Sequence, residues 1–320
     1  MPKTLPSLKQ FRGKADAVDE RTKVCFQRRS EYPTYTRKYM HKDNAIGMFM
    51  GLFIGDALGA PLEFIRPEHM TEVTSEMVGG GVHDTAIGEW TDDGAMAVAI
   101  ADAYISKGGF APSEIAANFK MWKKTGHFGT RDYVFDIGRT CSTSIDAMTT
   151  DRPYMGSTDF YASGNGTIMR LAPIMLANHN DVGLAIAESV AVSLMTHGTH
   201  NIVQCTAGFV SECMAGTKFL NYNRIRNYNT RNGERTVNTI MHAYAQAWNS
   251  VDLSHSFEDA VVHAVNLGYD ADTVGAVTGM LAGRIYGYSN MPKRWLNKLV
   301  KHDELLAMAE TLYALGGDDE

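Results

Sequence analysis

Cysteine is scarce in this chain of 320 residues. There are four cysteines, at Cys25, Cys141, Cys205 and Cys213, and no pair has the CxxC spacing of a zinc site. Thiols this few and this scattered do not form the dense disulfide framework of a small secreted domain. We therefore expect the chain in a reducing compartment and predict a cytoplasmic location.

Proline and long apolar runs are also sparse. Nine prolines beside thirty glycines are not the composition of a collagen-like or low-complexity chain. The N-terminal stretch MPKTLPSLKQ has no apolar run after its charges, and we expect no stretch to reach the roughly 18 apolar residues of a membrane span. Apolar residues still make up 44% of the chain, which is ample for a core. The composition predicts a globular protein without membrane contact.

The formal charge of −6 is unevenly distributed. Residues 1–43 hold eleven basic and five acidic side chains, whereas the remainder holds nineteen basic and thirty-one acidic ones. We interpret 1–43 as a basic extension that packs on a main domain at 44–320. Contact of the extension with nucleic acid or another acidic partner is the alternative.

Most of the chain after Asn44 has the apolar period of a helix. Apolar or small residues recur at i, i+3, i+4 and i+7, and Ser, Thr, Asp, Asn, Gly or Pro bounds most segments. The predicted helical segments are 45–59, 92–106, 113–124, 182–195, 202–220, 235–248, 257–268, 273–287 and 304–315. Alternating strand-like runs are nearly absent. The sequence therefore predicts one all-α domain of roughly ten or more helices.

Two of these segments carry glycine at every fourth position. The positions are Gly47, Gly51, Gly55 and Gly59 in one, and Gly275, Gly279, Gly283 and Gly287 in the other. Each interior glycine costs about 0.5–1 kcal/mol relative to alanine, a cost tolerated where another backbone approaches closely. We predict two central helices packed tightly against each other or against a ligand. A membrane GxxxG pair is the other interpretation, and Asp56 and Arg284 argue against it.

Acidic residues and a threonine gather at two predicted helix starts. The first cluster is Thr91, Asp92 and Asp93, and the second is Asp270, Asp272 and Thr273. Each cluster alone is explained by helix capping. Together they offer carboxylate and hydroxyl oxygens without thiolates, which is the ligand set of Mg²⁺ or Mn²⁺ rather than Zn²⁺. If the two helix starts face each other, we expect a site for two metal ions.

Other motifs suit ligand contact or proton transfer. Glu63 lies in an apolar setting where burial would raise its pKa, although it is equally explained as a helix-end charge. The loop at Gly164, Asn165 and Gly166 and the loop at 79–81 expose backbone N–H groups to a ligand. His197 lies in the motif SLMTHGTHN and is a candidate polar residue of the same region.

These motifs, in this order, resemble the ADP-ribosylglycohydrolase family over roughly residues 44–315. The matching stretches are GLFIGDALGAPLEF, GEWTDDGAMAVAIADA, DIGRT, SGNGTIMR, THGTH and LGYDADTVGAVTGMLAGRIYG. The resemblance implies a single compact, orthogonal all-α domain with a binuclear metal cleft. Gly94 and Tyr269 depart from the pattern of many members, and Tyr269 is expected to affect the substrate pocket.

The resemblance also implies roles for individual residues. The implied metal ligands are Thr91, Asp92, Asp93, Asp270, Asp272 and Thr273, with two Mg²⁺ or Mn²⁺ ions as cofactors. The implied catalytic residues are Glu63, Asp136, Asp92 and Asp272, with Asp136 near the acceptor. The implied ADP-ribose-binding residues are Gly79, Gly80, Gly81, Gly164, Asn165, Gly166 and His197.

The implied activity is metal-dependent removal of ADP-ribose from modified protein side chains. Arginine is the expected acceptor because DIGRT resembles the arginine-specific branch of the family. The alternatives are hydrolysis of serine-linked ADP-ribose or of a small O-linked molecule, and a non-catalytic ADP-ribose binder. The expected partner is thus an ADP-ribosylated protein or an ADP-ribose-containing small molecule.

Overall fold

The computed structural model describes residues 40–70, 73–159, 161–216 and 238–317. Longer α-helices account for most of this part: α3 (Lys42–Gly59), α4 (Asp92–Lys107), α5 (Pro112–Thr125), α6 (Arg139–Ala147), α8 (Val182–Thr196), α9 (His200–Ala215), α11 (Ile240–Asp252), α12 (Phe257–Val265), α13 (Ala271–Tyr286) and α15 (His302–Leu315). Two short helices, α7 (Ala172–Ala177) and α14 (Lys293–Leu296), join them. Most of the predicted extension, and Cys25, lie outside the described residues.

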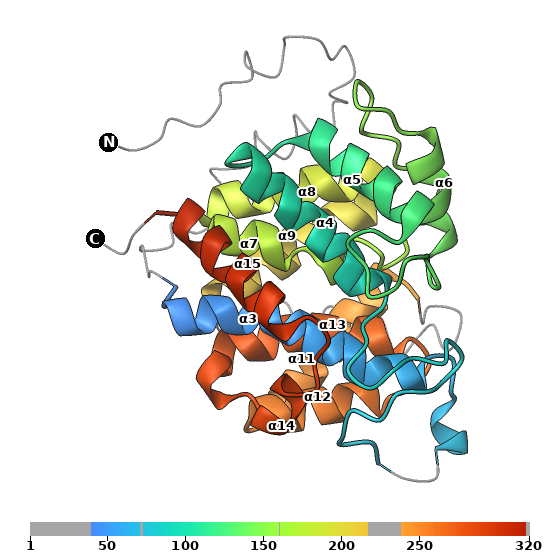
Figure 1. Ribbon diagram of the computed structural model, residues 1–320, viewed down its shortest axis with the longest axis vertical. Coiled ribbons are helices and arrows are strands. Elements are labelled where there is room, and N and C mark those ends of the chain that lie inside the picture. Colours follow the sequence, from blue (N-terminus) through green and yellow to red (C-terminus); the bar gives the residue numbers. More distant parts are fainter. Residues whose placement is uncertain (1–39, 71–72, 160, 217–237, 318–320) are drawn as a thin grey trace.

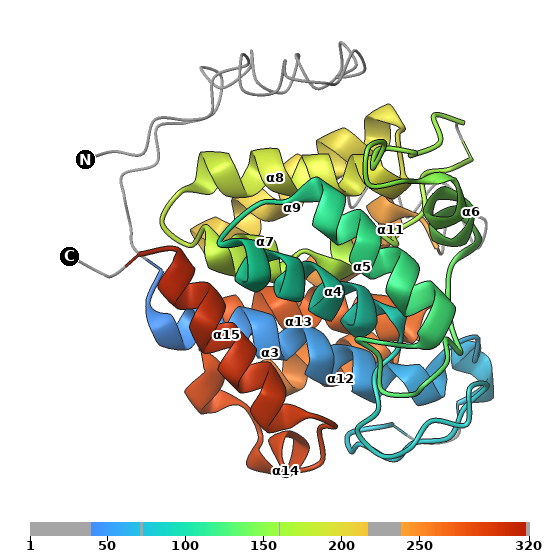
Figure 2. The same ribbon diagram turned by 45° about the horizontal axis from the view of Figure 1, so that its top comes forward.

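The described residues form no β-strand, only isolated bridges. Helices α3 and α13 lie side by side at the centre (Figures 1 and 2). Helices α4, α5, α8 and α9 lie on one side of this pair, whereas α12 and α14 lie on the other (Figures 1 and 2). The prediction of an all-α fold is confirmed.

The central pair packs backbone against backbone along the two glycine stripes. A Cβ atom added to Gly47 would lie 2.5 Å from the Gly283 carbonyl oxygen. Added to Gly51 or Gly55, it would come closer than 3.0 Å to the carbonyl of Gly279 or Gly275. The pairing runs in opposite directions along the two helices, so they are antiparallel. The prediction that two glycine-striped helices pack tightly is confirmed, with each other as partners.

The apolar character of α3 corrects one expectation from the sequence. The helical stretch Lys42–Leu62 contains 18 consecutive residues with a mean hydropathy of 1.6 and is long and apolar enough to cross a membrane, so the expectation that no stretch would suffice was wrong. The qualifying window is 100% buried inside the protein. A helix that touches α13, α7, α15 and α4 is surrounded by other helices, and its sequence is apolar on all sides for that reason.

Helix starts and stops follow the local sequence. The side chains of Thr91, Asp181, Thr199, Thr239 and Ser256 accept a backbone hydrogen bond from the first turn of α4, α8, α9, α11 and α12, respectively. Helices α4, α5 and α9 end at glycines in the left-handed conformation. Helices α6, α7 and α14 were not predicted, because they are short and lack a full apolar repeat.

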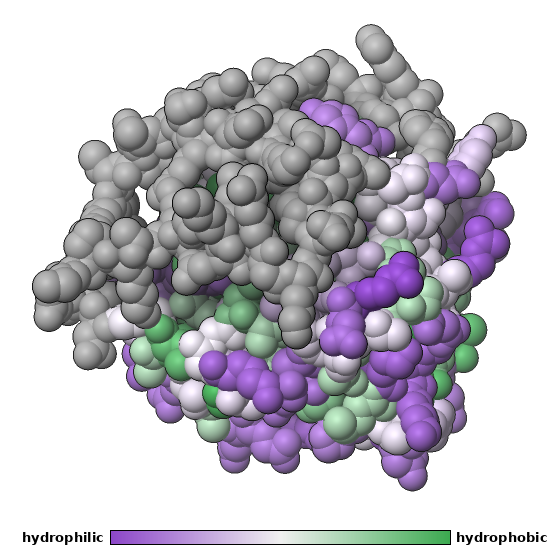
Figure 3. Space-filling view, turned by 90° about the horizontal axis from the view of Figure 1, so that it is seen from above, coloured by the Kyte–Doolittle hydropathy of each residue, from purple (hydrophilic) through white to green (hydrophobic). Residues whose placement is uncertain are grey.

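The outer surface is mixed in character. On the part drawn in colour in Figure 3, hydrophilic side chains surround and interrupt the apolar areas. Many of the large apolar side chains are buried in the interior, among them Trp90, Trp295, Phe49 and Phe53. This division agrees with one continuous core around α3 and α13.

The glycine contact gives a stability prediction. In Gly279→Ala the new methyl group would overlap the Gly51 carbonyl, and backbone atoms cannot move aside as a flexible side chain does. We expect a loss of about 3 kcal/mol, or about 5–10 °C in melting temperature, measured by thermal denaturation. Gly138→Ala is the control, since Gly138 has φ −61° and open space around it. Equal melting temperatures for the two variants would contradict the backbone contact.

Candidate functional site

The antiparallel pair brings two loops to one end of the molecule. A Cβ atom on Gly59, the last residue of α3, would lie closer than 3.0 Å to the carbonyl of Ala271, the first residue of α13. Glu63 follows shortly after α3, and Asp270 is the N-cap of α13. Ligand atoms of Glu63, Asp270 and Asp272 therefore all lie within 4.8 Å of one another.

The start of α4 is fixed to the same place by Asp56, a fully buried residue of α3. Its carboxylate accepts the backbone N–H of Thr91 at 2.9 and 3.1 Å and that of Gly94 at 2.9 Å. These bonds satisfy N–H groups that the first turn of a helix leaves free. Asp56 thus holds Thr91, Asp92 and Asp93 beside the end of α3.

The two predicted acidic clusters meet. The Thr91 hydroxyl donates to Asp272 Oδ2 at 3.4 Å, and the Thr273 hydroxyl donates to Asp93 Oδ1 at 3.4 Å. All six residues of the clusters are buried, with exposures of 1–7%. The two helix N-termini, with their partial positive charge, face the same cluster of oxygens.

The donor set fits a hard divalent cation. Every side chain of the two clusters offers carboxylate or hydroxyl oxygen, the ligands that Mg²⁺ and Mn²⁺ prefer. Asp93 Oδ2 is buried and has no hydrogen-bond partner among the residues that the structure describes. Such an oxygen is costly to bury unless a cation or another donor reaches it. The acidic groups are positioned for a metal site.

Burial and mutual repulsion disfavour the charged forms of these carboxyls. Burial, then the neighbouring Asp272, raises the pKa of Asp93 well above its ordinary value. Burial also raises the pKa of Asp270 to about 6, although hydrogen bonds from Asn165 and others oppose the shift. Burial, followed by the charges of Asp272 and Asp136, raises the pKa of Glu63 to about 11. A bound cation would reverse these shifts by neutralising the negative charge.

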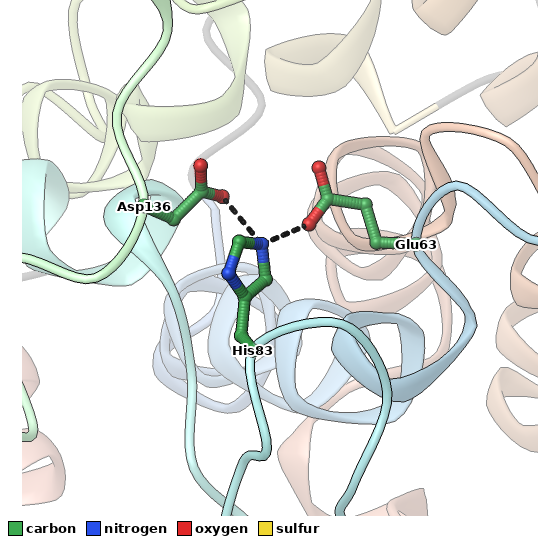
Figure 4. Close-up of side chains that lie close together, drawn as sticks. All are labelled: Glu63, His83 and Asp136. Carbon is green, nitrogen blue, oxygen red and sulfur yellow. Dashed lines mark hydrogen bonds and ion pairs between the residues drawn. The ribbon is translucent and has the colours of Figure 1, made fainter.

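Glu63, His83 and Asp136 form a second group next to the acidic clusters. His83 Nε2 lies 2.7 Å from Glu63 Oε2 and 3.7 Å from Asp136 Oδ2 (Figure 4). Asp136 also adjoins the α4 cluster, because its charge contributes to the raised pKa of Asp92 after burial. The structure therefore brings the predicted catalytic residues Glu63, Asp136, Asp92 and Asp272 into one region.

The Gly164–Gly166 loop touches this region through Asn165. The Asn165 side-chain amide donates a hydrogen bond to Asp270 Oδ2, and a Cβ atom on Gly164 would lie 3.2 Å from His197 Nε2. His197 is 2% exposed, and burial, then Arg170, lowers its pKa to about 3. His197 is thus a neutral ring that packs against Gly164 and Gly166 of the loop.

The glycines at 79–81 form a tight turn on the other side. Gly79, Gly80 and Gly81 have φ of 68°, 95° and 70°, values that residues with a side chain rarely adopt. Gly81 packs against the backbone of Pro61, two residues before Glu63. No atom of the described residues lies within 4 Å of a Cβ atom built on Gly80, so the backbone of Gly80 has open space beside it in this part of the structure.

Three residues of this region were missed by the sequence analysis. Asp56 was visible as a charge within an apolar helix, which signals a buried polar contact. Arg170 is fully buried and donates to Thr196 Oγ1 at 2.7 Å, and Thr196 in turn contacts His197 Nδ1 at 2.9 Å. The available signal for Arg170 was its position at the end of the stretch SGNGTIMR. His83 carried no local signal beyond the preceding glycines.

Comparison with known proteins shows to which family the chain belongs. The family model described as ADP-ribosylglycohydrolase matches residues 37–320. The ADP-ribosylarginine hydrolase Tri1 of Serratia proteamaculans is 31% identical over 87% of this chain and 81% of its own length. The ADP-ribosyl-[dinitrogen reductase] glycohydrolase of Rhodospirillum rubrum is 29% identical over 87% and 98%.

A solved structure shares the fold. The chain titled "ADP-ribosylglycohydrolase-related protein complex" aligns with a TM-score of 0.74 at 30% identity, covering 86% of this chain and 98% of that one. The residues matched by the family model include both acidic helix starts and the loops between them. This chain belongs to the ADP-ribosylglycohydrolase family.

Proposed function

We propose that this chain is a metal-dependent hydrolase that removes ADP-ribose from modified arginine side chains of proteins. The observation that carries the proposal is the meeting of the two acidic helix starts, with hydroxyl to carboxylate contacts of 3.4 Å between them. The arginine linkage is supported by the DIGRT motif and by two ADP-ribosylarginine hydrolases among the relatives, those of Serratia proteamaculans and Pseudomonas putida.

The metal ligands we propose are those of the two clusters: Thr91, Asp92, Asp93, Asp270, Asp272 and Thr273. Two ions, Mg²⁺ or Mn²⁺, suit this many oxygen donors. When bound, such ions polarise oxygens of a substrate and lower the pKa of a water molecule.

The surrounding residues then have separate tasks. Glu63 lies within 4.8 Å of Asp270 and Asp272, so it is placed to take a proton from a water molecule held at the clusters. Asp136 lies on the more exposed side of the region, where the acceptor side chain would lie. The buried carboxylates would stabilise the positive charge that develops on the ribose as its bond to nitrogen breaks.

The glycine loops are proposed to hold the rest of the ADP-ribose. The open backbone at Gly80 and the loop of Gly164, Asn165 and Gly166 offer N–H groups to phosphate or ribose oxygens. His197 supports the second loop from below. A cytoplasmic location and a domain boundary near residue 44 stay predictions.

The first test measures release of ADP-ribose. Wild type with Mg²⁺ or Mn²⁺ is expected to release ADP-ribose from an arginine-modified protein. Asp272→Ala is expected to lower the rate by about 100-fold or more, because a buried charged oxygen donor at the reacting centre is lost. Asp303→Ala is the matched control, since the Asp303 side chain is fully exposed on α15.

The same assay separates the alternatives. An arginine-linked, a serine-linked and a small O-linked ADP-ribose substrate are compared under one set of conditions. Faster release from serine or the small molecule would move the proposal to those substrates. Binding of ADP-ribose without turnover of any of the three would instead show a non-catalytic binder. Unchanged release by Asp272→Ala would contradict the proposed metal site.

The second test uses metal and pH together. Folding raises the pKa of Asp56 from 3.8 to about 7 and that of Asp270 from 3.8 to about 6. An acid with a raised folded-state pKa binds its proton more tightly when folded, so the metal-free protein loses stability as pH rises from about 4 to 7. Divalent cations bind the deprotonated clusters, so Mg²⁺ or Mn²⁺ should raise the melting temperature more at pH 8 than at pH 5.

Asp93→Asn provides the check on that measurement. Loss of the Asp93 charge is expected to remove most of the metal-induced rise at pH 8, as followed by differential scanning fluorimetry. An equal rise in Asp93→Asn and wild type would place the bound cation elsewhere.

A further inference from the structure

Large apolar and aromatic side chains that are exposed to solvent gather in one segment beside the site. Among the described residues ten such side chains are exposed, and five of them lie between Phe64 and Ile87. This segment joins α3 to α4 and lies at the edge of the molecule (Figures 1 and 2). Exposed apolar residues scattered singly are ordinary, whereas a group of them on one surface marks an interaction site.

The turn that begins at the triple glycine carries three of these side chains. Val78, Val82 and Ile87 are 55%, 61% and 53% exposed. Two backbone hydrogen bonds close the turn, from Gly80 N to Thr85 O at 2.7 Å and from Thr85 N to Gly80 O at 2.9 Å. A backbone held by its own hydrogen bonds therefore presents these apolar side chains to solvent.

Phe64 extends the same surface toward the reacting centre. It directly follows Glu63, is 58% exposed and has a φ of 61°. A phenylalanine adopts this conformation at a cost, and burial of the ring does not compensate for it here. The centroid of the Phe64 ring lies 6.4 Å from that of the His83 ring. Phe64 and the glycine turn therefore meet at His83.

Aromatic side chains continue the surface past His83. The ring of His83 lies 5.6 Å from that of Phe135, measured between centroids. The Arg131 guanidinium carbon lies 4.2 Å from the centre of the Phe135 ring and 5.7 Å from that of Tyr133, which is 55% exposed. These contacts connect the segment after α3 with the segment before α6. We call the exposed surface the apolar rim; its members are Phe64, Val78, Val82, Ile87 and Tyr133.

The charges beside the apolar rim suit a positively charged arginine. Asp84 and Asp132, each next to the rim, are exposed. The guanidinium of Arg131 is paired with buried Glu89 at 2.7 Å, and it also donates to the Asp84 carbonyl at 2.9 Å. The charge of Arg131 is therefore balanced within the protein. A guanidinium from outside would meet carboxylates and aromatic rings, the two kinds of group on which it packs well.

We propose that the apolar rim docks the polypeptide that carries the modified arginine. This inference rests on the proposed hydrolase function and concerns the part of the substrate beyond its ADP-ribose. The modified arginine reaches the site past the acidic groups, and apolar side chains that flank it in its own chain pack on the rim. Removal of this apolar surface from water favours a modified polypeptide over free ADP-ribosylarginine.

A second copy of this chain is the other possible occupant of the rim. On this face it would cover Asp136, the most exposed member of the group with Glu63 and His83. It would thus hinder the entry of a modified side chain. The polypeptide substrate has no such conflict with the proposed reaction.

Three substrates test the proposal in one assay of ADP-ribose release with Mg²⁺ or Mn²⁺. Two peptides of equal length carry an ADP-ribosylated arginine, flanked by leucine and valine in one and by serine in the other. The third substrate is free ADP-ribosylarginine. For wild type we expect kcat/KM to be about 10-fold higher for the apolar peptide than for the serine peptide, chiefly through a lower KM.

Variants of the apolar rim assign this preference to its side chains. The double variant Val82→Ser, Ile87→Ser is expected to reduce the preference to less than about threefold, while kcat/KM for free ADP-ribosylarginine stays within about twofold of wild type. Val82→Ile keeps an apolar side chain and is expected to keep the preference. Phe64 is left unchanged, because its turn also positions Glu63. Melting temperatures confirm that each variant is folded.

The matched control is Leu253→Ser. Leu253 is 66% exposed and follows α11, a helix of 13 residues. The other end of α11 adjoins the Gly-Asn-Gly loop, where Ile240 N donates to Ser163 O at 3.0 Å. The length of the helix therefore places Leu253 about 20 Å from that loop. This variant is expected to leave kcat/KM for all three substrates unchanged.

The outcomes separate the apolar rim from the proposed function. Equal kcat/KM of wild type for the two peptides overturns the docking surface, and so does a double variant that keeps the full preference. An equal loss on all three substrates shows a merely structural effect and overturns it as well. A dimer of wild type in size-exclusion chromatography that the double variant lacks would assign the rim to a second copy instead.

Wild type that releases no ADP-ribose from any substrate overturns the proposed function itself. The apolar rim is then judged by the affinity of wild type for the two peptides, measured by fluorescence anisotropy. Tighter binding of the apolar peptide that the double variant loses supports the docking surface, whereas equal affinities overturn it too.

Discussion

The backbone contact between α3 and α13 is the constraint on which the site depends. Glycine at every fourth position leaves each helix with a face that has no side chains, and the two faces meet directly. Each glycine lowers the stability of its own helix by about 1 kcal/mol relative to alanine. The close approach compensates through dense packing, and it also fixes the register of the pair. That register brings Gly59 against Ala271, and so Glu63 next to Asp270.

The same helix pair explains how so many carboxyls are held in a buried place. Asp56 of α3 fixes the start of α4, and α13 begins at the site itself. Two helix N-termini therefore supply partial positive charge, and backbone N–H groups satisfy part of the oxygen surface. This is not enough to balance the negative charge, because Asp93 Oδ2 has no hydrogen-bond partner in the described part of the chain and the pKa of the neighbouring Asp272 is raised. The excess of negative charge is the physical reason to expect cations here.

Sequence patterns predicted these features where the information was local or periodic. The helical repeat gave nine segments that the structure contains at least in part, and the four-residue glycine period gave the central pair. The acidic helix starts were recognisable by their capping pattern, and their meeting follows from the glycine register together with Asp56. The role of Asp56 was harder to foresee, because its partners Thr91 and Gly94 lie 35 and 38 residues away.

The contacts of His83 could not be predicted from the sequence, because its partners are also distant along the chain and lie in irregular segments. Its carboxyl partners lie 20 and 53 residues away in irregular segments, where no period relates one position to another. The position of that loop depends also on Arg131, from the segment after α5, which pairs with buried Glu89 of the same loop. Tertiary contacts of this kind are set by the folded backbone, whereas apolar repeats report only on the faces of helices.

The turns beside the site show how its geometry is kept. Phe64 and Tyr269 follow Glu63 and precede Asp270, and both have positive φ, at 61° and 56°. Bulky residues seldom adopt this conformation, and its cost is of order 1–3 kcal/mol at each position. The strain is offset by a reciprocal pair of backbone bonds, from Phe64 N to Tyr269 O at 2.6 Å and from Tyr269 N to Ile65 O at 2.8 Å. These bonds join the two turns directly. The backbone therefore fixes the position of Glu63 relative to Asp270. A shift of either turn would break both bonds and move a carboxyl out of the cluster.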